Sequence, residues 1–393
     1  MIRKGRLFTP GPTQLLPAAQ LAMAGATMHH RTAEFRALFS RVLADLKTFV
    51  GTHNDVVMFT ASGTGAMEAA VSNLTSPGDK VLVVSAGKFG ERWEGLAKAY
   101  GCAVDTVRGP YGQTVTPQQV RHALKPEHKV LFLQATESST GTRHDVEGIA
   151  RLLKSSDTLL VVDAITGLGT THFDVDGWGI DVIIGGSQKA VMIPPGLAYC
   201  AVSQRAWQRM ETARNPRYYF DLRKENKNGA KGETSYTPAT ALVAALAAAL
   251  DYIREQGGGD LAAGRELLVN NAETAAAMTR AAAQALGLKL FSSSSPGAAL
   301  TAITAPDGVD SSDIVKAFRN PFGAIVANGQ GEMKGQLFRI AHLGYYDYLD
   351  TIAAIGALEQ VLAELGREVE FGAGLRAAQE VYAEASQQVA VPQ

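Results

Sequence analysis

Short runs of apolar, β-branched residues alternate with stretches of helical spacing from residue 56 onward. The six runs that we predict as strands are residues 56–60, 81–84, 130–134, 158–163, 181–184 and 197–202. The run at 158–162 is apolar at nearly every position, which is typical of parallel strands covered on both faces. The pattern therefore predicts an α/β fold with a mainly parallel sheet, which binds its ligands at the carboxyl ends of the strands.

The pattern changes after residue 204. The basic stretch 214–231 is predicted to be a solvated surface loop near a subunit interface, with recognition of an acidic substrate as the alternative. An alanine-rich helix at 239–255 ends at three glycines, because glycine costs about 1 kcal/mol relative to alanine within a helix. Beyond them, a small α+β unit is predicted, with helices at 261–286, 311–318 and 348–365 and weak strands at 300–304 and 338–341.

These changes predict four segments along the chain. They are an N-terminal arm for the substrate and the dimer (1–20), a large domain (21–257), a small C-terminal domain (258–366) and a polar tail with at most a short helix (367–393).

Composition narrows the class of protein. The chain has 393 residues, 46% of them apolar, and a net charge of −1, so it can close a large core but has no basic excess to attract nucleic acid. No apolar segment follows the charged first residues as in a secretion signal, and the longest apolar run, 241–250, is too short to span a membrane. Cys102 and Cys200 are read as buried thiols. We therefore expect a soluble, cytoplasmic protein that binds small molecules.

The first candidate binding feature is the turn Ser62-Gly63-Thr64-Gly65, between a strand and a helix. Backbone N–H groups and the helix dipole at such a turn can bind a phosphate, although an ordinary tight turn would have the same sequence. Glu68 stands where a dinucleotide-binding fingerprint needs glycine, and the Gly-Lys-Ser/Thr of a P-loop is missing. The turn thus indicates a phosphate but neither of these two nucleotide sites.

Three charged residues lie in or beside apolar strands. Asp163 ends one strand, where an unpaired buried charge costs several kcal/mol, so we expect a partner; an N-cap or a metal ligand is the alternative. Lys189 follows two glycines, where desolvation can make its amine nucleophilic, unless it is an ordinary surface lysine. Arg339 suits bidentate binding of a carboxylate, or else extends from an edge strand into water.

Seven motifs in a fixed order carry a resemblance that covers about residues 7–365. They are Thr9-Pro10-Gly11-Pro12-Thr13, Ser62-Gly63-Thr64-Gly65, Glu137-Ser138-Ser139-Thr140-Gly141, Val162-Asp163-Ala164, Gly186-Ser187-Gln188-Lys189-Ala190 with Pro194-Pro195-Gly196, Tyr236-Thr237-Pro238, and Phe338-Arg339-Ile340. With them the chain resembles the fold-type I, class V aminotransferases that use pyridoxal 5′-phosphate (PLP), and within these the alanine/serine–glyoxylate (serine–pyruvate) group. The resemblance implies a mainly parallel seven-stranded sheet in the large domain.

The resemblance also implies roles for individual residues. Lys189 would bind PLP covalently and move a proton at the substrate Cα, while Asp163 would keep the ring nitrogen protonated. Arg339 would bind the substrate carboxylate beneath the loop that contains Gly11. The other expected cofactor-binding residues are Ser62, Gly63, Thr64 and Gln188 at the phosphate, Phe89, Ser138 and Ile165 around the ring, and Tyr236 and Thr237 from the second subunit of a homodimer.

The sequence departs from the family pattern at two of these positions. Phe89 stands where the family often has a tryptophan, and Thr64 where several relatives have a histidine. A phenylalanine still stacks on a planar ring, so we expect effects on cofactor affinity or substrate choice but not on the chemistry.

The expected reaction is amino transfer from alanine or serine to glyoxylate or pyruvate. The absence of an evident second arginine argues against aspartate or glutamate as the preferred donor. The alternatives are another class V reaction (a lyase, a desulfurase, or transfer from a phosphonate or ureido donor), a non-catalytic subunit of a redox complex, and, least favoured, a dinucleotide-dependent oxidoreductase. No metal site is expected, because His29-His30 lacks metal-ligand spacing.

Overall fold

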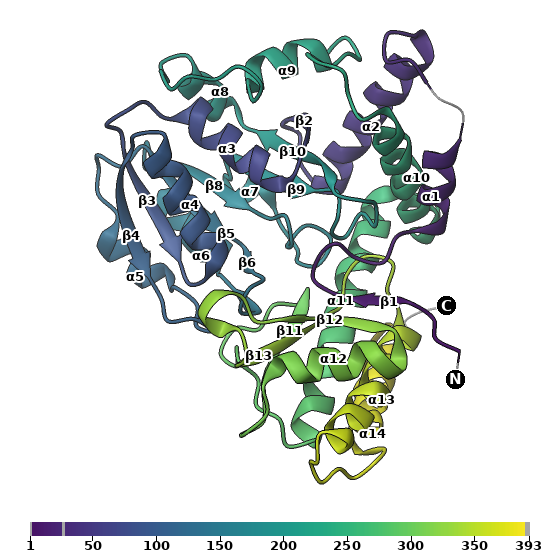
Figure 1. The fold of residues 1–393 in the computed structure, drawn as a ribbon. Helices are drawn as coiled ribbons and strands as arrows, with labels where there is room; N and C mark the ends of the chain where they lie inside the picture. The colour runs from purple at the N-terminus through teal and green to yellow at the C-terminus, as the bar shows by residue number, and fades with distance from the viewer. Residues whose placement is uncertain (1, 26–27, 390–393) are drawn as a thin grey trace.

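The computed structural model describes residues 2–25 and 28–389, and its larger layer is a seven-stranded sheet (Figure 1). Its strands are β2 (Asp55–Ala61), β3 (Lys80–Ser85), β4 (Ala103–Arg108), β5 (Val130–Gln134), β8 (Leu159–Asp163), β9 (Val182–Gly186) and β10 (Gly196–Val202). The order is β2-β10-β9-β8-β5-β3-β4, and only β10 runs antiparallel to its neighbours. The predicted α/β fold with a mainly parallel sheet is confirmed.

Helices cover both faces of this sheet, which explains why its strands are apolar at successive positions. In β2, Val56 and Met58 enter one core, whereas Val57 and Phe59 enter the other. The first core is completed by α2 (Ala33–Val50), α6 (Val146–Leu153) and α10 (Thr240–Gln256), and the second by α3 (Gly63–Leu74), α4 (Lys88–Ala99) and α8 (Gln204–Met210). The remaining elements of this part are α1 (Pro17–Ala24), α5 (Pro117–Ala123), α7 (Val175–Trp178) and the hairpin β6 (Thr136–Glu137) with β7 (Thr142–Arg143).

β4 and α9 (Leu222–Gly229) are two of the elements of this part that the pattern did not predict. β4 is an edge strand, and polar residues such as Asp105 and Arg108 break its apolar run. The basic stretch predicted as a loop contains α9, whose first turn is capped by the Asp221 side chain, which accepts a hydrogen bond from Lys224 N. α9 is nearly all polar on its outer side, so periodicity does not reveal it.

The second sheet has four strands in the order β1-β12-β13-β11. β11 (Leu300–Thr304) and β13 (Leu337–Ala341) match the two predicted strands, while β12 (Ala324–Asn328) was not predicted. β1 (Arg6–Phe8) comes from the N-terminus and pairs with β12, so the N-terminal segment completes the sheet of the C-terminal part. Helices α11 (Leu261–Ala285), α12 (Ser311–Phe322) and α13 (Tyr348–Glu364) pack on it, and the short 3₁₀ helix η1 (Gly331–Met333) precedes β13.

The end of the chain forms α14 (Ala373–Val389), a longer helix than predicted, which packs against α11 and α13. Ala378 and the half-buried Leu375 meet Met278 of α11 and Ile355 of α13. Its apolar stripe consists mostly of small residues and is narrow, which is why the sequence indicated only a short helix there.

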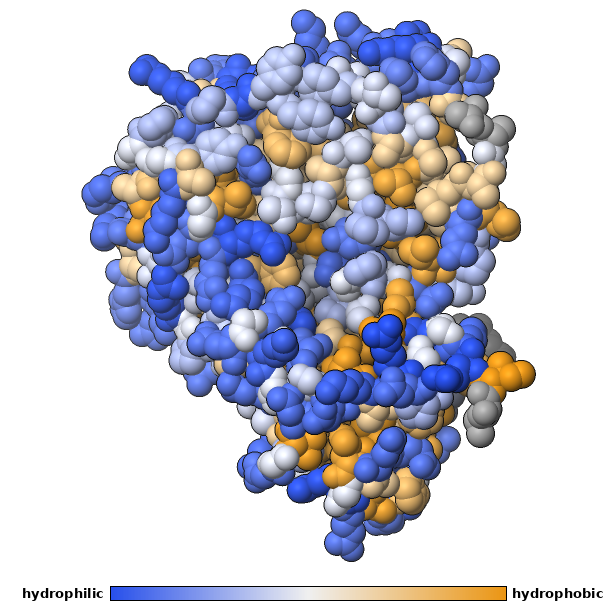
Figure 2. Space-filling model, in the orientation of Figure 1, coloured by the Kyte–Doolittle hydropathy of each residue, from blue (hydrophilic) through white to orange (hydrophobic). Residues whose placement is uncertain are grey.

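The outer surface is mostly hydrophilic on the face shown in Figure 2, with apolar patches that are small and separate. Large apolar side chains that are exposed include Leu21, Tyr218 and Leu349. Within the described ranges, none of the helices combines the length and the apolar character that crossing a bilayer requires.

We expect Ala378→Asp to separate α14 from the rest of the chain. The substitution places a carboxylate where the side chain is 0% exposed, so we expect it to cost about 2 kcal/mol or more of the free energy of unfolding. Urea unfolding monitored by circular dichroism measures this cost, and Ala377→Asp on the same helix is the control. Equal stability of the two variants would show that α14 does not depend on this contact.

Candidate functional site

A cavity of about 280 Å³ lies at the carboxyl ends of the parallel strands. Its walls come from the ends of β8 and β9, the first turns of α3 and α4, the β6 region and the N-terminal loop. The residues that line it are Gly11, Ser62, Gly63, Thr64, Phe89, Arg92, Thr136, Ser138, Asp163, Ile165, Thr166, Gln188 and Lys189. The structure therefore brings together most of the residues that the sequence singled out.

The N-terminus of α3 forms one end of this cavity. Ser62 is the N-cap residue, and its side chain makes no capping hydrogen bond, so the hydroxyl can turn to a ligand. A Cβ at Gly63 would overlap Ile165 Cδ1, so only glycine lets the backbone approach Ile165 this closely. Gln188 Oε1 is buried without a hydrogen-bond partner among the described residues. The Ser62 hydroxyl and the first N–H groups of α3 can donate hydrogen bonds to a bound phosphate, and Gln188 can donate through its amide nitrogen but not through Oε1.

Asp163 ends β8 inside the cavity, where its residue is 6% exposed. Its Oδ1 accepts a hydrogen bond of 2.9 Å from Ile165 N. Burial raises the pKa of Asp163 to about 6, although the Ile165 N–H and the charges of Lys189 and Arg92 oppose this rise. A carboxyl group in this setting can pair with a protonated ring nitrogen of a ligand.

Lys189 lies just beyond β9, and its residue is 8% exposed. Its amine donates a hydrogen bond to the Pro10 carbonyl. Burial lowers the pKa of Lys189 to about 8, and the nearby Asp163 opposes this shift while Arg339 adds to it. A buried amine with this pKa is neutral in an appreciable fraction of molecules near neutral pH, as a nucleophile or a general base requires.

The N-terminal loop packs directly on this lysine. Gly11 has φ +144°, and a Cβ there would lie 2.6 Å from Lys189 Nζ, so both its backbone conformation and the space require glycine. Thr13 holds the loop in place, since its N–H bonds to the Gln188 carbonyl and its hydroxyl to the Lys189 carbonyl. The loop thus closes the cavity over the amine.

Arg339 belongs to β13 in the C-terminal part, and its residue is 4% exposed. Its Nη1 donates to the Ser138 carbonyl at 2.6 Å, and its Nε donates to the Asn328 carbonyl at 3.2 Å. Burial lowers the pKa of Arg339 to about 10, and the charge of Glu137 opposes the shift. Arg339 does not itself line the cavity, but it is hydrogen-bonded to Ser138, which does. Within residues 2–25 and 28–389 no carboxylate forms an ion pair with Arg339, so this buried cation remains available to a carboxylate ligand.

Arg92 was not identified from the sequence, yet it lines the cavity beside Phe89. Its guanidinium lies 4.7 Å from the centroid of the Phe89 ring, and Nη1 donates to Thr64 Oγ1 at 3.1 Å. Both residues lie in the first turns of α4, three positions apart, and that spacing places them on one helix face. This spacing was the signal that could have revealed Arg92.

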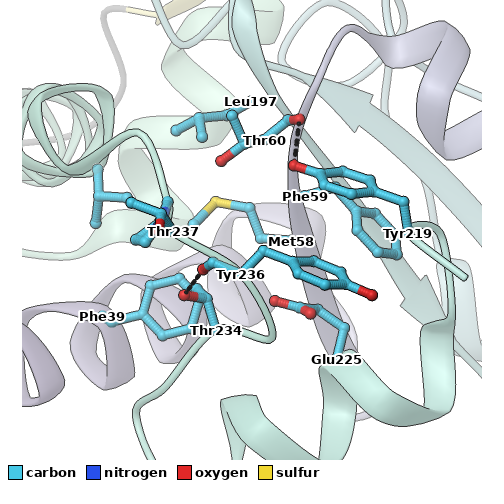
Figure 3. Close-up of a pocket in the computed structure, with 12 residues that line it drawn as sticks. Phe39, Met58, Phe59, Thr60, Leu197, Tyr219, Glu225, Thr234, Tyr236 and Thr237 are labelled. Carbon is cyan, nitrogen blue, oxygen red and sulfur yellow. Dashed lines mark hydrogen bonds between the residues drawn. The ribbon is translucent and has the colours of Figure 1, made fainter. Parts of the chain in front are cut away.

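Tyr236 and Thr237 do not reach this cavity within one chain. They line a separate cavity of about 20 Å³ together with Thr60 and Tyr219 (Figure 3). Tyr219 OH donates to the Thr60 carbonyl at 3.4 Å, and Thr234 Oγ1 donates to the Tyr236 carbonyl at 2.6 Å. The tyrosine rings at 219 and 236 stack with centroids 4.9 Å apart. These residues surround the backbone of β2 just before the phosphate-binding turn.

The cysteines and the histidine pair contribute no group to the main cavity. Cys102 and Cys200 are buried and unpaired, and burial raises the pKa of Cys200 to about 12. The rings of His29 and His30 lie 4.7 Å apart. The described part of the chain contains no cluster of three or more His, Cys, Asp or Glu side chains that could hold a metal ion.

The raised pKa of Asp163 predicts a pH dependence of stability in the cofactor-free protein. Between about pH 4 and 6 the folded chain keeps a proton on Asp163 that the unfolded chain releases, so stability falls as the pH rises through this window. We expect Asp163→Asn to remove this fall, which is on the order of 2 kcal/mol. Urea unfolding at several pH values measures it, with the exposed Asp307→Asn as the control. An unchanged slope in Asp163→Asn would contradict the assignment.

Comparisons with known proteins support one family. The family model described as aminotransferase class-V matches residues 16–332. A soluble hydrogenase small subunit from Synechococcus sp. is 39% identical, covering 96% of this chain and 98% of its own length. The L-aspartate–glyoxylate aminotransferase of Paracoccus denitrificans is 33% identical, covering 97% of each chain. The solved structure of an alanine–glyoxylate aminotransferase from Nostoc sp. has a TM-score of 0.85 and 30% identity, covering 92% of this chain and 96% of its own.

Proposed function

Since the chain belongs to the class V aminotransferase family, with the fold of the fold-type I enzymes, we propose that it uses PLP to move an amino group from alanine or serine to glyoxylate or pyruvate. The observation that carries the proposal is the single cavity in which the buried amine of Lys189 and the buried carboxyl of Asp163 lie beside the phosphate-binding turn of α3. No feature of the fold itself requires these two charged groups to be buried together.

PLP, when bound, supplies an electron-withdrawing ring that stabilises negative charge at the substrate Cα. In the proposal, Ser62, Gly63, Thr64 and Gln188 bind its phosphate, and Asp163 holds a proton at its ring nitrogen. Phe89 and Ile165, which line the same cavity, would contact its ring, and Ser138 would lie near the ring oxygen. The Ser62 hydroxyl, which makes no capping hydrogen bond, and the N–H groups at the start of α3 fit this group, because both can donate hydrogen bonds to its phosphate.

Lys189 and Arg339 would act on the substrate itself. The amine of Lys189 would hold the cofactor and, when free, would move the proton at the substrate Cα as a general base and acid. Its lowered pKa suits this role, because an amine with an ordinary lysine pKa would remain protonated. Arg339 fixes the α-carboxylate, and the Gly11 loop keeps water away from the amine.

We also propose a homodimer whose subunits share their sites. Tyr236 and Thr237 would reach the phosphate bound to the other subunit, in agreement with their position outside their own cavity. Tyr218 is 77% exposed and Tyr219 is 41% exposed beside them, and large aromatic side chains are enriched in subunit interfaces.

Two alternative functions are less well supported. Desulfuration needs a reactive thiolate on an accessible loop, but Cys200 is buried in β10 with a raised pKa and Cys102 is also buried. The second alternative is a non-catalytic role, with which the name of the relative called a hydrogenase subunit would agree. A purely structural subunit, however, has no use for a buried lysine and a buried acid in one cavity.

An acidic donor is the second candidate, and Arg92 is the observation that favours it. Arg92 provides a second cation at the cavity that contains Lys189, in contrast to the expectation of a single arginine. One relative is named L-aspartate–glyoxylate aminotransferase. A distal carboxylate of aspartate could bind Arg92 while Arg339 binds the α-carboxylate.

We expect the purified wild-type protein with PLP to be yellow. Lys189→Ala should lose the visible absorbance of the bound cofactor, and its transamination rate should fall by about 10³-fold or more, because the variant lacks both the base and the group that attaches the cofactor. Absorbance spectra and a coupled assay with alanine and glyoxylate measure this, and the exposed Lys129→Ala is the control. A wild-type chain that stays colourless with added PLP would refute the proposal.

A donor panel with Arg92→Ala tests the second candidate. If Arg92 binds the distal carboxylate, kcat/KM for L-aspartate falls about 10- to 100-fold more than kcat/KM for L-alanine, with glyoxylate as the acceptor. Arg121→Ala on α5 is the control. Equal losses for the two donors would assign Arg92 to the cofactor instead of the substrate.

A further inference from the structure

Glu137 is a buried carboxylate for which the reaction outlined above has no use. Its residue is 0% exposed, and among the described residues no lysine, arginine or histidine forms an ion pair with it. Burial raises the pKa of Glu137, and the hydrogen bonds that its carboxyl group accepts from Ser139, Gly90 and Phe89 oppose this rise. These hydrogen bonds show what Glu137 holds in place.

The carboxylate of Glu137 caps the first turn of α4. Oε2 accepts hydrogen bonds from Phe89 N at 3.0 Å and Gly90 N at 3.1 Å. The first N–H groups of a helix have no partners within the helix, and the positive end of the helix dipole stabilises a negative charge. Glu137 therefore fixes the backbone of Phe89, whose side chain lines the cavity.

The other carboxylate oxygen holds the turn that follows β6. Oε1 accepts hydrogen bonds from Ser139 N at 3.2 Å and Ser139 Oγ at 2.5 Å, and Ser139 Oγ in turn accepts one from Lys88 N at 3.1 Å. The contact is so close that a Cβ at Gly87 would lie 2.5 Å from Glu137 Cδ and 2.6 Å from Ser139 Oγ. The carboxylate thereby joins the start of α4 to the turn.

The same turn supports the arginine of the C-terminal part. Ser138, between Glu137 and Ser139, accepts the 2.6 Å hydrogen bond from Arg339 Nη1 through its carbonyl. The negative charge of Glu137 is also close enough to favour the charged form of Arg339. One buried side chain is therefore connected to both the aromatic wall and the carboxylate-binding cation.

We propose that Glu137 is a positioning residue that holds Phe89 against the cofactor ring. This inference rests on the proposed binding of PLP, and it assigns Glu137 no contact with the reacting atoms.

Glu137→Gln tests this role, because it changes one carboxylate oxygen to an amide nitrogen and keeps the size of the side chain. The amide nitrogen cannot accept a hydrogen bond. Whichever way the amide faces, either the N–H groups of Phe89 and Gly90 or the N–H group of Ser139 lose their acceptor, so the link that holds the start of α4 to the turn is weakened. We expect the Kd of PLP to rise about tenfold and the visible circular dichroism of the bound cofactor to fall. Removing a negative charge near Arg339 does not weaken an anion at that cation, so the affinity for a carboxylate should stay the same or increase.

The experiment uses the full chain. The cofactor is removed and PLP is titrated back, and visible absorbance and circular dichroism monitor its binding. The protein saturated with PLP is then titrated with 2-methylalanine, which has an α-carboxylate and no proton on Cα. The proposal predicts a raised Kd for PLP and no rise in the Kd for 2-methylalanine.

Glu359→Gln is a matched control. Glu359 is also a buried glutamate, and it accepts hydrogen bonds from Gly372 N, Gly374 N and Leu375 N at the start of α14, away from the cavity. This variant should lower Tm without changing either Kd. Ser139→Ala removes one donor and keeps the carboxyl group of Glu137. This variant replaces Glu137→Gln in the titrations if Glu137→Gln does not fold. It should raise the Kd of PLP about two- to fivefold and leave 2-methylalanine binding unchanged.

Three results would overturn the proposal. The first is an affinity for PLP that equals the wild-type value in Glu137→Gln, or in Ser139→Ala if this variant replaces it. The second is a parallel rise of both Kd values, which would indicate a general loss of structure. The third is a wild-type chain that binds no PLP, which would overturn the proposed function as well, whereas the first two leave that function intact.

Discussion

The burial of two opposite charges in one cavity is the constraint on which the site depends. Lys189 and Asp163 are 8% and 6% exposed, and each partly offsets the shift that burial imposes on the pKa of the other. The parallel sheet makes this placement possible, because β8 and β9 are neighbours and end at the same edge. Burial keeps the amine close to its neutral form and the carboxyl able to hold a proton.

The surrounding parts of the chain enclose this pair. The N-terminal segment pairs with β12 in the C-terminal part and then crosses to the large sheet, where Gly11 packs on the amine of Lys189. Arg339 belongs to β13 and donates a hydrogen bond to the carbonyl of Ser138, which lines the cavity. Segments from three regions of the sequence thus meet at one site, and a ligand that bridges Lys189 and Arg339 would hold the two parts of the molecule together.

Much of this arrangement could be predicted from the sequence, because buried strands and charged residues at their ends leave a strong local signal. The strands that form the centre of the sheet and the turn at Ser62 are of this kind. β4 was missed since its polar positions resemble a loop, and β1 because only its pairing with β12 makes it a strand. β12 is apolar at four of its five positions, so its sequence did carry a strand signal. Arg92 and Glu137 were not recognised as partners of Phe89, because their contacts depend on how α4 packs beside β6. Such contacts join segments far apart in the sequence, so no local pattern shows them.

The central claim is that the buried amine of Lys189 is the group that binds the cofactor. Borohydride reduction of the protein with bound PLP fixes the cofactor to the amine that holds it, and peptide mass spectrometry then locates the attachment. The account predicts a single modified peptide that contains Lys189. Attachment to a different lysine, or the absence of any attachment in protein that has bound PLP, would contradict it.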